Sequence, residues 1–239
     1  MKKALLGFSA VLALTSLPAT SYAQFAFNVG AVSDYRYRGI SQTRVKPALQ
    51  GGVDFSAGGL YLGLWASNIK WIEDFGGDAG TEIDLYGGYK GELSPGLNYD
   101  VGVLSYRYPS NKLNPSANTT EVYGALTFGP ATLKYSHALT DTFGNPDSKN
   151  SYYLDLSAGF EVWDGWTLAP HIGHQKIKGP TSSFSSYTDY SLTASKDYSG
   201  FVVSAGIVGT DADKTFYASP ANGKYLGKTS LVVGVKKTF

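Results

Sequence analysis

Residues 49–67 read LQGGVDFSAGGLYLGLWAS and contain two runs in which apolar and other side chains alternate. The apolar positions are Leu49, Val53, Phe55, Ala57, Leu60, Leu62, Leu64 and Ala66. Successive side chains of a β-strand point to opposite faces of the sheet, so each run fits a strand with one apolar face. The glycines at 58–59 separate the runs, and the pattern predicts a β-hairpin with an apolar and a more polar face.

The same alternation recurs along the chain. It predicts strands at 25–38, 49–57, 60–67, 82–90, 98–108, 119–129, 131–139, 151–161, 167–177, 187–196, 201–210 and 228–239. In the first of these, Tyr35 and Tyr37 share the apolar parity, whereas Asp34, Arg36 and Arg38 share the polar one. We therefore expect the tyrosines to face lipid and the charged residues to face the interior.

The connections between these strands alternate in length. Short turns lie at 57–59, 94–96, 129–130, 163–166 and 196–200, and longer polar segments lie at 39–47, 68–80, 109–118, 140–150, 178–186 and 211–227. Lipid offers the backbone no hydrogen-bond partner, so a sheet in a membrane must close on itself. The sequence predicts an all-β fold: a closed antiparallel transmembrane β-barrel of about 12 strands, with short periplasmic turns and long extracellular loops.

The first 23 residues differ from the rest. Lys2 and Lys3 precede an apolar run that ends near Leu17, followed by Pro18 and small residues up to Ala23, which predicts a signal peptide at 1–23 and a barrel domain at 24–239. Removing both lysines leaves 18 basic against 19 acidic residues, a balance that argues against nucleic acid as a partner. The predicted location is the cell outer membrane.

Aromatic residues near the strand ends indicate girdles at the two lipid–water interfaces. They are Phe25, Phe27, Tyr35, Tyr37, Tyr89, Tyr99, Tyr152, Phe160, Trp163, Trp166 and Phe239. The simpler interpretation is that aromatic residues merely favour strands. The terminal Phe239, after Leu231, Val233 and Val235 at the same parity, is typical of the signal that the barrel assembly machinery recognises, so that machinery and outer-membrane lipid are expected partners.

The stretch SDYRYRGISQT at 33–43, with KPALQGGVDF, GLYLGLWASNI and the closing VGVKKTF, resembles the TorF-like family of proteobacterial outer-membrane porins, formerly a domain of unknown function. The similarity covers about Phe25 to Phe239, and the RGISQ block is its most specific part. The resemblance implies an outer-membrane barrel and a pore. It supplies no substrate and no catalytic residues.

Lumen-facing charges are the candidate constriction residues: Asp34, Arg36, Arg38, Glu82, Asp84, Glu121, Asp155 and Lys228. Counting along alternating strands places basic groups on one wall and carboxylates on the facing wall, with a mild preference for cations. The alternatives are that Asp34 and Arg36 only fill the interior, or that the charges pair directly and plug the barrel.

The histidines give little support to an enzyme. His171 and His174 are three apart, which on a strand points them to opposite faces, so they are not expected to share a metal. His137, near Thr140 and Asp141 at a loop rim, lacks any nucleophile signature, and the paired glycines fit turns and barrel curvature. The sequence predicts no catalytic residues, no metal and no cofactor.

Three functions stay open, together with a soluble periplasmic β-sandwich as an alternative fold. The favoured one is a porin-like channel for passive diffusion of small polar solutes or ions through a charged lumen. The second is a closed structural or surface-recognition barrel that acts through its extracellular loops. The third is an outer-membrane hydrolase built on His137 or His171.

Overall fold

The structure is a computed structural model that describes residues 23–239. Apart from Ala23, the predicted signal peptide lies outside the described residues. Within residues 23–239, no helix is long and apolar enough to cross a membrane.

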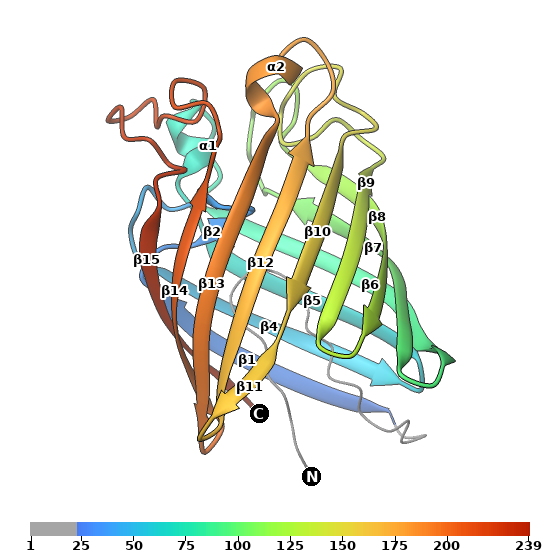
Figure 1. Ribbon diagram of the computed structural model, residues 1–239. Helices are drawn as coiled ribbons and strands as arrows, with labels where there is room; N and C mark the ends of the chain where they lie inside the picture. The colour runs from blue at the N-terminus through green and yellow to red at the C-terminus, as the bar shows by residue number, and fades with distance from the viewer. Residues whose placement is uncertain (1–22) are drawn as a thin grey trace.

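The described chain is built mostly from strands (Figure 1). They are β1(Gln24–Val32), β2(Arg36–Tyr37), β3(Ile40–Ser41), β4(Ala48–Ala57), β5(Leu60–Asn68), β6(Thr81–Ser94), β7(Leu97–Arg107), β8(Thr119–Phe128), β9(Ala131–Ala138), β10(Tyr152–Ala158), β11(Phe160–Trp163), β12(Trp166–Lys176), β13(Tyr187–Tyr198), β14(Phe201–Thr210) and β15(Ser230–Thr238). Two short helices, α1(Trp71–Asp74) and α2(Ser182–Ser185), lie in the connections after β5 and β12.

The large sheet closes on itself. β1 pairs with both β4 and β15, and β10 pairs with β12 as well as with β9, so the ladder returns to its start. β10 and β11 both pair with β12 and are two segments of one strand, interrupted at Gly159. With these counted as one, the barrel has 12 antiparallel strands, which confirms the predicted fold class and strand number.

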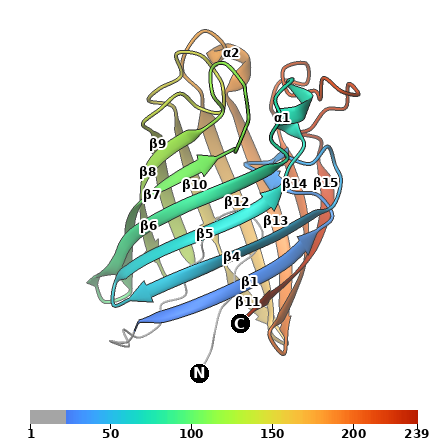
Figure 2. The same cartoon turned by 180° about the vertical axis from the view of Figure 1, so that it is seen from behind.

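The outward face of the barrel is apolar. Phe27 on β1, Leu62 on β5, Leu156 on β10 and Leu231 on β15 are all exposed, as are many outward neighbours at the same parity. The view from behind shows β1, β4, β5 and β6 crossing this wall obliquely, as strands of a closed barrel must (Figure 2). Hydrocarbon around this band would remove the exposed apolar surface from water.

The predicted aromatic girdles are present in part. Phe25, Phe27, Tyr89, Phe160, Trp163 and Phe239 are exposed on the outside of the barrel. Tyr35 and Tyr37 contradict the prediction, because Tyr35 is only 5% exposed and both pack inside the outer mouth. These two tyrosines do not face lipid.

The reason is that the first strand ends at Val32 and not at Arg38. Ser33 N–H still donates to the carbonyl of Val233 at 2.8 Å, but the chain then leaves the wall and enters the lumen. Residues 33–47, here called the lumenal hairpin, contain the short antiparallel pair β2 and β3. The turn between them runs through Arg38 and Gly39, both with positive φ, and glycine adopts φ of +80° readily.

The last strand also differs from its predicted range. It begins at Ser230, so Lys228 lies in the preceding loop and is exposed. Long connections gather at one end of the barrel, here called the outer end, and short turns at the other. The predicted alternation of long and short connections is therefore confirmed. The end of the barrel that faces the periplasm stays a prediction.

Side chains fill part of the outer mouth. Ile69 and Ile72, from the connection that carries α1, are fully buried against a cluster that includes Tyr35, Tyr106 and Tyr108. The N–H of Lys70 donates to the carbonyl of Gln42 at 2.7 Å, which ties this connection to the lumenal hairpin. The hairpin therefore packs against the connection that carries α1 as well as against the barrel wall.

Candidate functional site

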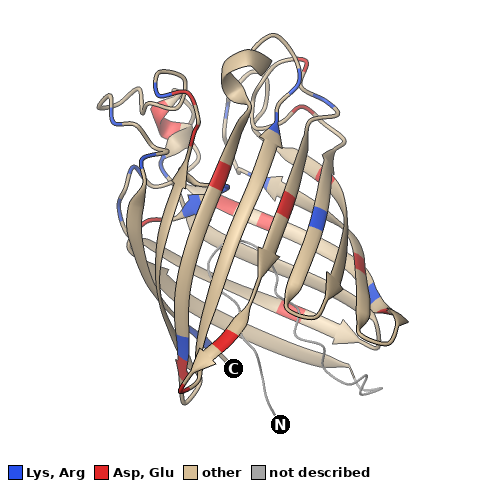
Figure 3. Ribbon diagram, viewed as in Figure 1, with Lys and Arg blue, Asp and Glu red and all other residues tan. Residues whose placement is uncertain are grey.

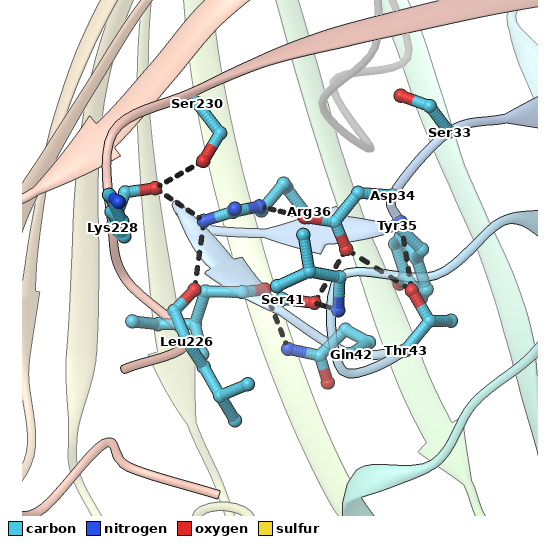
Figure 4. Close-up of polar contacts among 12 residues, drawn as sticks. Ser33, Asp34, Tyr35, Arg36, Ser41, Gln42, Thr43, Leu226, Lys228 and Ser230 are labelled. Carbon is cyan, nitrogen blue, oxygen red and sulfur yellow. Dashed lines mark hydrogen bonds and ion pairs between the residues drawn. The ribbon is translucent and has the colours of Figure 1, made fainter. Parts of the chain in front are cut away.

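The lumenal hairpin is organised around Asp34 (Figure 4). One carboxylate oxygen accepts from Arg36 Nε at 2.5 Å, and the other accepts from the hydroxyls of Ser41 at 2.5 Å and Thr43 at 3.2 Å. Both charged side chains are almost fully buried. Asp34 therefore accepts hydrogen bonds from three residues of the same short segment. These bonds help to explain how a charged hairpin is stable away from the wall.

Arg36 also anchors the hairpin to the last long loop (Figure 4). Its Nη1 donates to the carbonyl of Leu226 at 2.8 Å, to that of Lys228 at 3.2 Å and to that of Gly39 at 3.0 Å. Lys228 thus reaches Arg36 through its backbone oxygen, and its ammonium is not part of the lumenal cluster. Nη2 of Arg36 is buried with no hydrogen-bond partner among the described residues.

Arg38, at the tip of the hairpin, bridges the lumen. Its Nη2 lies 2.7 Å from Glu121 Oε2 and its Nη1 lies 3.0 Å from Oε1, a bidentate pair with the carboxylate on β8. Nη1 also donates to the side-chain oxygen of Gln175 on β12. Burial disfavours the charge and Glu121 favours it, and the balance raises the pKa of Arg38 above its ordinary value.

The guanidinium of Arg38 also stacks on aromatic rings. Its central carbon lies 4.2 Å from the Tyr153 ring centroid and 4.8 Å from that of Tyr37. A planar guanidinium suits both the bidentate pair and this stacking, which a lysine would not reproduce. The tip is therefore fixed to β8, β10 and β12, far along the wall from the strand on which the hairpin starts.

Two tyrosines fix the stem of the hairpin to β6 and β7, and β7 is next to β8 in the sheet. Tyr35 donates its hydroxyl to Glu82 Oε1 on β6 at 2.8 Å, and Tyr37 donates to the Tyr106 hydroxyl on β7 at 2.8 Å. Burial raises the pKa of the Tyr35 phenol, so the proton stays available for Glu82. The Tyr35 ring also meets Trp65 edge to face at 5.4 Å.

Asp84 differs from the other candidates on the wall. It is only 4% exposed, and its Oδ1 has no hydrogen-bond partner among residues 23–239. Glu82 and Asp84 lie on β6 and Glu121 lies on β8, at inward-facing positions in the outer half of the barrel. Only Glu121 of these three is paired with a base.

A second charged cluster lies beyond the tip. His171 Nε2 on β12 is 2.5 Å from Asp155 Oδ2 on β10, and Nδ1 is 3.6 Å from Asp189 Oδ1 on β13. Tyr153 donates to Asp189 Oδ2 at 2.9 Å. Sequence reasoning missed His171 and Asp189 as lumenal partners. Their parity was readable, but their pairing depends on which strands become neighbours.

The predicted opposition of a basic wall and an acidic wall is wrong in its placement. Arg36 and Arg38 lie on the hairpin inside the lumen, and Lys228 lies in a loop, so none of the three is part of a wall. The parity of 33–38 is the same for a strand and for a hairpin, so alternation could not separate the two cases. The arginines meet carboxylates directly, which is the arrangement weighed above as a plug.

The histidines weighed for an enzyme occupy different faces. His171 is lumenal, whereas His174 and His137 point outward. His137 contacts the Tyr135 hydroxyl and the Asn150 side chain, both at 3.2 Å. Among the described residues, no serine side chain makes a hydrogen bond to His137 or His171, and no group of three or more metal-binding side chains occurs.

The C-terminal strand closes the barrel against the first. Phe239 N–H donates to the Phe27 carbonyl at 2.8 Å, and Phe27 N–H donates back to Phe239 at 3.2 Å. The Phe239 ring is 70% exposed on the lipid side. The exposed side chain is accessible to another protein. The role of Phe239 as an assembly signal stays a prediction.

Comparison with known proteins identifies a family and a fold. The chain belongs to the Gcw_chp family, described as bacterial protein of unknown function, whose model matches residues 17–239. That description does not carry the TorF-like name, which stays a sequence prediction. No curated protein matches the chain.

Several solved structures share the barrel. A KdgM porin superposes with a TM-score of 0.58 at 10% identity, covering 90% of this chain and 99% of that one. A NanC porin gives 0.54 at 10% identity, with the same coverages. The COG4313 outer membrane channel from Pseudomonas putida F1 gives 0.54 at 12% identity, covering 90% of this chain and 95% of that one. At such low identity the similarity establishes the fold: this chain has the fold of an outer-membrane porin.

Proposed function

We propose that the protein is an outer-membrane porin-like channel for passive diffusion of small polar solutes or ions. The observation that carries the proposal is a closed barrel with an apolar outside and an inside lined by charged and hydroxyl side chains. Lipid solvates the first surface and water the second. The porins that share this fold support the same reading at the level of architecture.

The lumenal hairpin is the constriction of this channel. It enters from the β1 side, holds β6 and β7 through Tyr35 and Tyr37, and reaches β8 and β12 through Arg38. A segment that contacts the wall on several sides narrows the path that remains. Asp34, Arg36 and Arg38 of the hairpin, with Glu82, Asp84, Glu121 and Asp155 of the wall, are the groups a passing solute meets.

Planar bilayer recordings test this function. Refolded residues 24–239 are compared with a variant in which a glycine–serine linker replaces residues 34–42, the part that carries the contacts of Tyr35, Tyr37 and Arg38 to the wall. We expect discrete conductance steps from the natural protein and larger steps from the variant. Equal steps would show that the hairpin does not limit the current, and no steps from either protein would refute the channel.

A closed barrel is the second candidate, and burial favours it. Glu82, Glu121 and Asp155 are at most 2% exposed, although they face the lumen. In an open, water-filled path, lining carboxylates would keep contact with water. The same recordings distinguish the two functions, because a closed barrel gives steps only after the hairpin is replaced. Function would then reside in the outer loops.

A further inference from the structure

The inner half of the lumen, toward the short turns, carries three lysines that form no ion pair. Lys90 on β6, Lys134 on β9 and Lys236 on β15 all occupy lumen-facing positions and are partly exposed. Among residues 23–239, none of them makes a salt bridge to a carboxylate. Figure 3 shows how basic and acidic positions are distributed over the wall and the loops.

Three carboxylates lie near these lysines but bond to other side chains: two bond to tyrosines, and Asp155, which is opposite Lys134 in the β9–β10 ladder, bonds to His171. Asp54 on β4 accepts from the Tyr86 hydroxyl, and Asp100 on β7 accepts from the Tyr61 hydroxyl. Asp100 stands directly opposite Lys90 in the β6–β7 ladder, and yet no ion pair forms between them. These bonds occupy one oxygen of each carboxylate, and none of the three carboxylates forms an ion pair with Lys90, Lys134 or Lys236.

The three lysines lie on separate parts of the barrel wall. Asp100 is opposite both Lys90 on β6 and Ala125 on β8, and Ala125 is opposite Lys134 on β9. Three strand spacings of about 4.8 Å separate Lys90 from Lys134, roughly 14 Å along the wall. On the other side, Lys236 stands opposite Gly30 on β1 and Val202 on β14, and the order β15-β1-β4-β5-β6 places it four strand spacings from β6.

Two of the lysines lie over the faces of aromatic rings. Lys134 Nζ lies 3.8 Å from the Tyr123 ring centroid, and Lys90 Nζ lies 5.8 Å from that of Tyr61. Contact with an aromatic face holds an ammonium group in place while leaving its N–H donors free for another partner. The outer half is different, since both of its arginines are paired with carboxylates, Arg36 with Asp34 and Arg38 with Glu121.

We propose that Lys90, Lys134 and Lys236 form an anion-binding vestibule beneath the lumenal hairpin, which takes small solutes bearing carboxylate or phosphate groups. Rings of lysine or arginine are the arrangement that selects anions and phosphates in pores. This proposal adds the class of solute to the proposed channel function. Only the transport of that solute rests on the proposed function. Binding itself needs only an inner half that solutes can enter.

Isothermal titration calorimetry tests the site on refolded residues 24–239 in detergent, with inorganic phosphate and with citrate as probes at low salt. The test variant replaces Lys90, Lys134 and Lys236 with glutamine. The control replaces Lys149, Lys178 and Lys224, three exposed loop lysines, with glutamine and removes the same charge. A second matched pair is Lys236→Gln against Lys237→Gln, because these neighbours on β15 face opposite sides.

We expect the lumenal triple variant to lose affinity for citrate or phosphate by at least about ten-fold, and the control by less than about two-fold. The mobility shift on heating shows that each variant is folded. Equal affinity of the natural protein and the lumenal variant, equal loss in both triple variants, or no binding by the natural protein would overturn the proposal. Lysine-dependent binding without bilayer steps would uphold the vestibule while refuting the channel.

Discussion

Arg38 and Glu121 are 83 residues apart in the chain and form a bidentate ion pair inside the barrel, with N–O distances of 2.7 and 3.0 Å. One partner lies on the turn of a hairpin and the other on a strand of the wall. The side chains of both are at most 7% exposed. The pair therefore links the hairpin to the wall in a place where water cannot replace a lost partner.

Removing one side of this pair should be more harmful than removing both. Glu121→Gln leaves the Arg38 charge buried without its carboxylate, and breaking a buried pair in this way costs about 3–5 kcal/mol. The double variant Arg38→Met with Glu121→Gln should recover part of that loss. Urea unfolding midpoints in detergent measure both. Equal stability of Glu121→Gln and the natural protein would show that the pair does not hold the hairpin.

Replacing both Arg36 and Arg38 with serine distinguishes a structural cluster from a constriction. Both guanidiniums are buried and paired, so we expect the variant to lose heat resistance in the mobility assay. A constriction without a structural role would instead give a folded barrel whose reversal potential moves further toward cations. A stable double variant with an unchanged reversal potential would remove the two arginines from the solute path.

Periodicity was sufficient to predict the barrel from sequence. Alternation in twos sets the face of each residue, and loop lengths set the two ends, so runs such as Leu60–Asn68 were predicted nearly to the residue. The lumenal hairpin was not predicted, because Asp34, Arg36 and Arg38 alternate with tyrosines whether they extend a strand or leave it. Parity gives a face, and only pairing across the barrel decides which side chains meet.

The site was predictable to the same extent. Parity alone places Glu82, Asp84, Glu121 and Asp155 on the inward face of their strands, and all four are buried. Their partners were not, because Tyr35 and Glu82 are separated by 47 residues and His171 and Asp155 lie on different strands. Which carboxylates the lumenal tyrosines bond to depends on register, which the count of 18 tyrosines in the sequence does not give.

Glycines opposite lumenal tyrosines should be intolerant of substitution. A Cβ on Gly63 would overlap the Tyr86 ring on the neighbouring strand β6. Gly63→Ala forces that ring to move, and overpacking of this kind costs about 1–3 kcal/mol. Gly124→Ala on β8 is the matched control, since its Cβ would meet nothing closer than 4.0 Å. Comparable urea midpoints for the two variants would show that the tyrosine ring adapts freely.

The orientation of the barrel is open to a labelling test. The start of β1 and the C-terminus lie at the end of the barrel that carries the short turns, so we expect the six long connections to face the outside of the cell. Epitope tags inserted at 109–118 or 211–227 should bind antibody on intact cells, and a tag in the turn at 163–166 should not. Binding to the first two tags only after permeabilisation would mean that the topology is inverted.

Phe239 should matter for assembly more than for stability. Its backbone bonds to Phe27 do not depend on the side chain, and the ring is exposed, so Phe239→Asp leaves the contacts within the barrel almost intact. A protein that recognises the C-terminal aromatic residue would nevertheless fail to bind the variant. We expect unfolded chain in the periplasm and little heat-modifiable protein in the outer membrane, measured by fractionation and mobility.

Phe25→Asp, a similarly exposed aromatic on β1, is the control for charge on the lipid face. Normal yields of Phe239→Asp, or an equal loss in Phe25→Asp, would assign the effect to lipid contact and not to a signal.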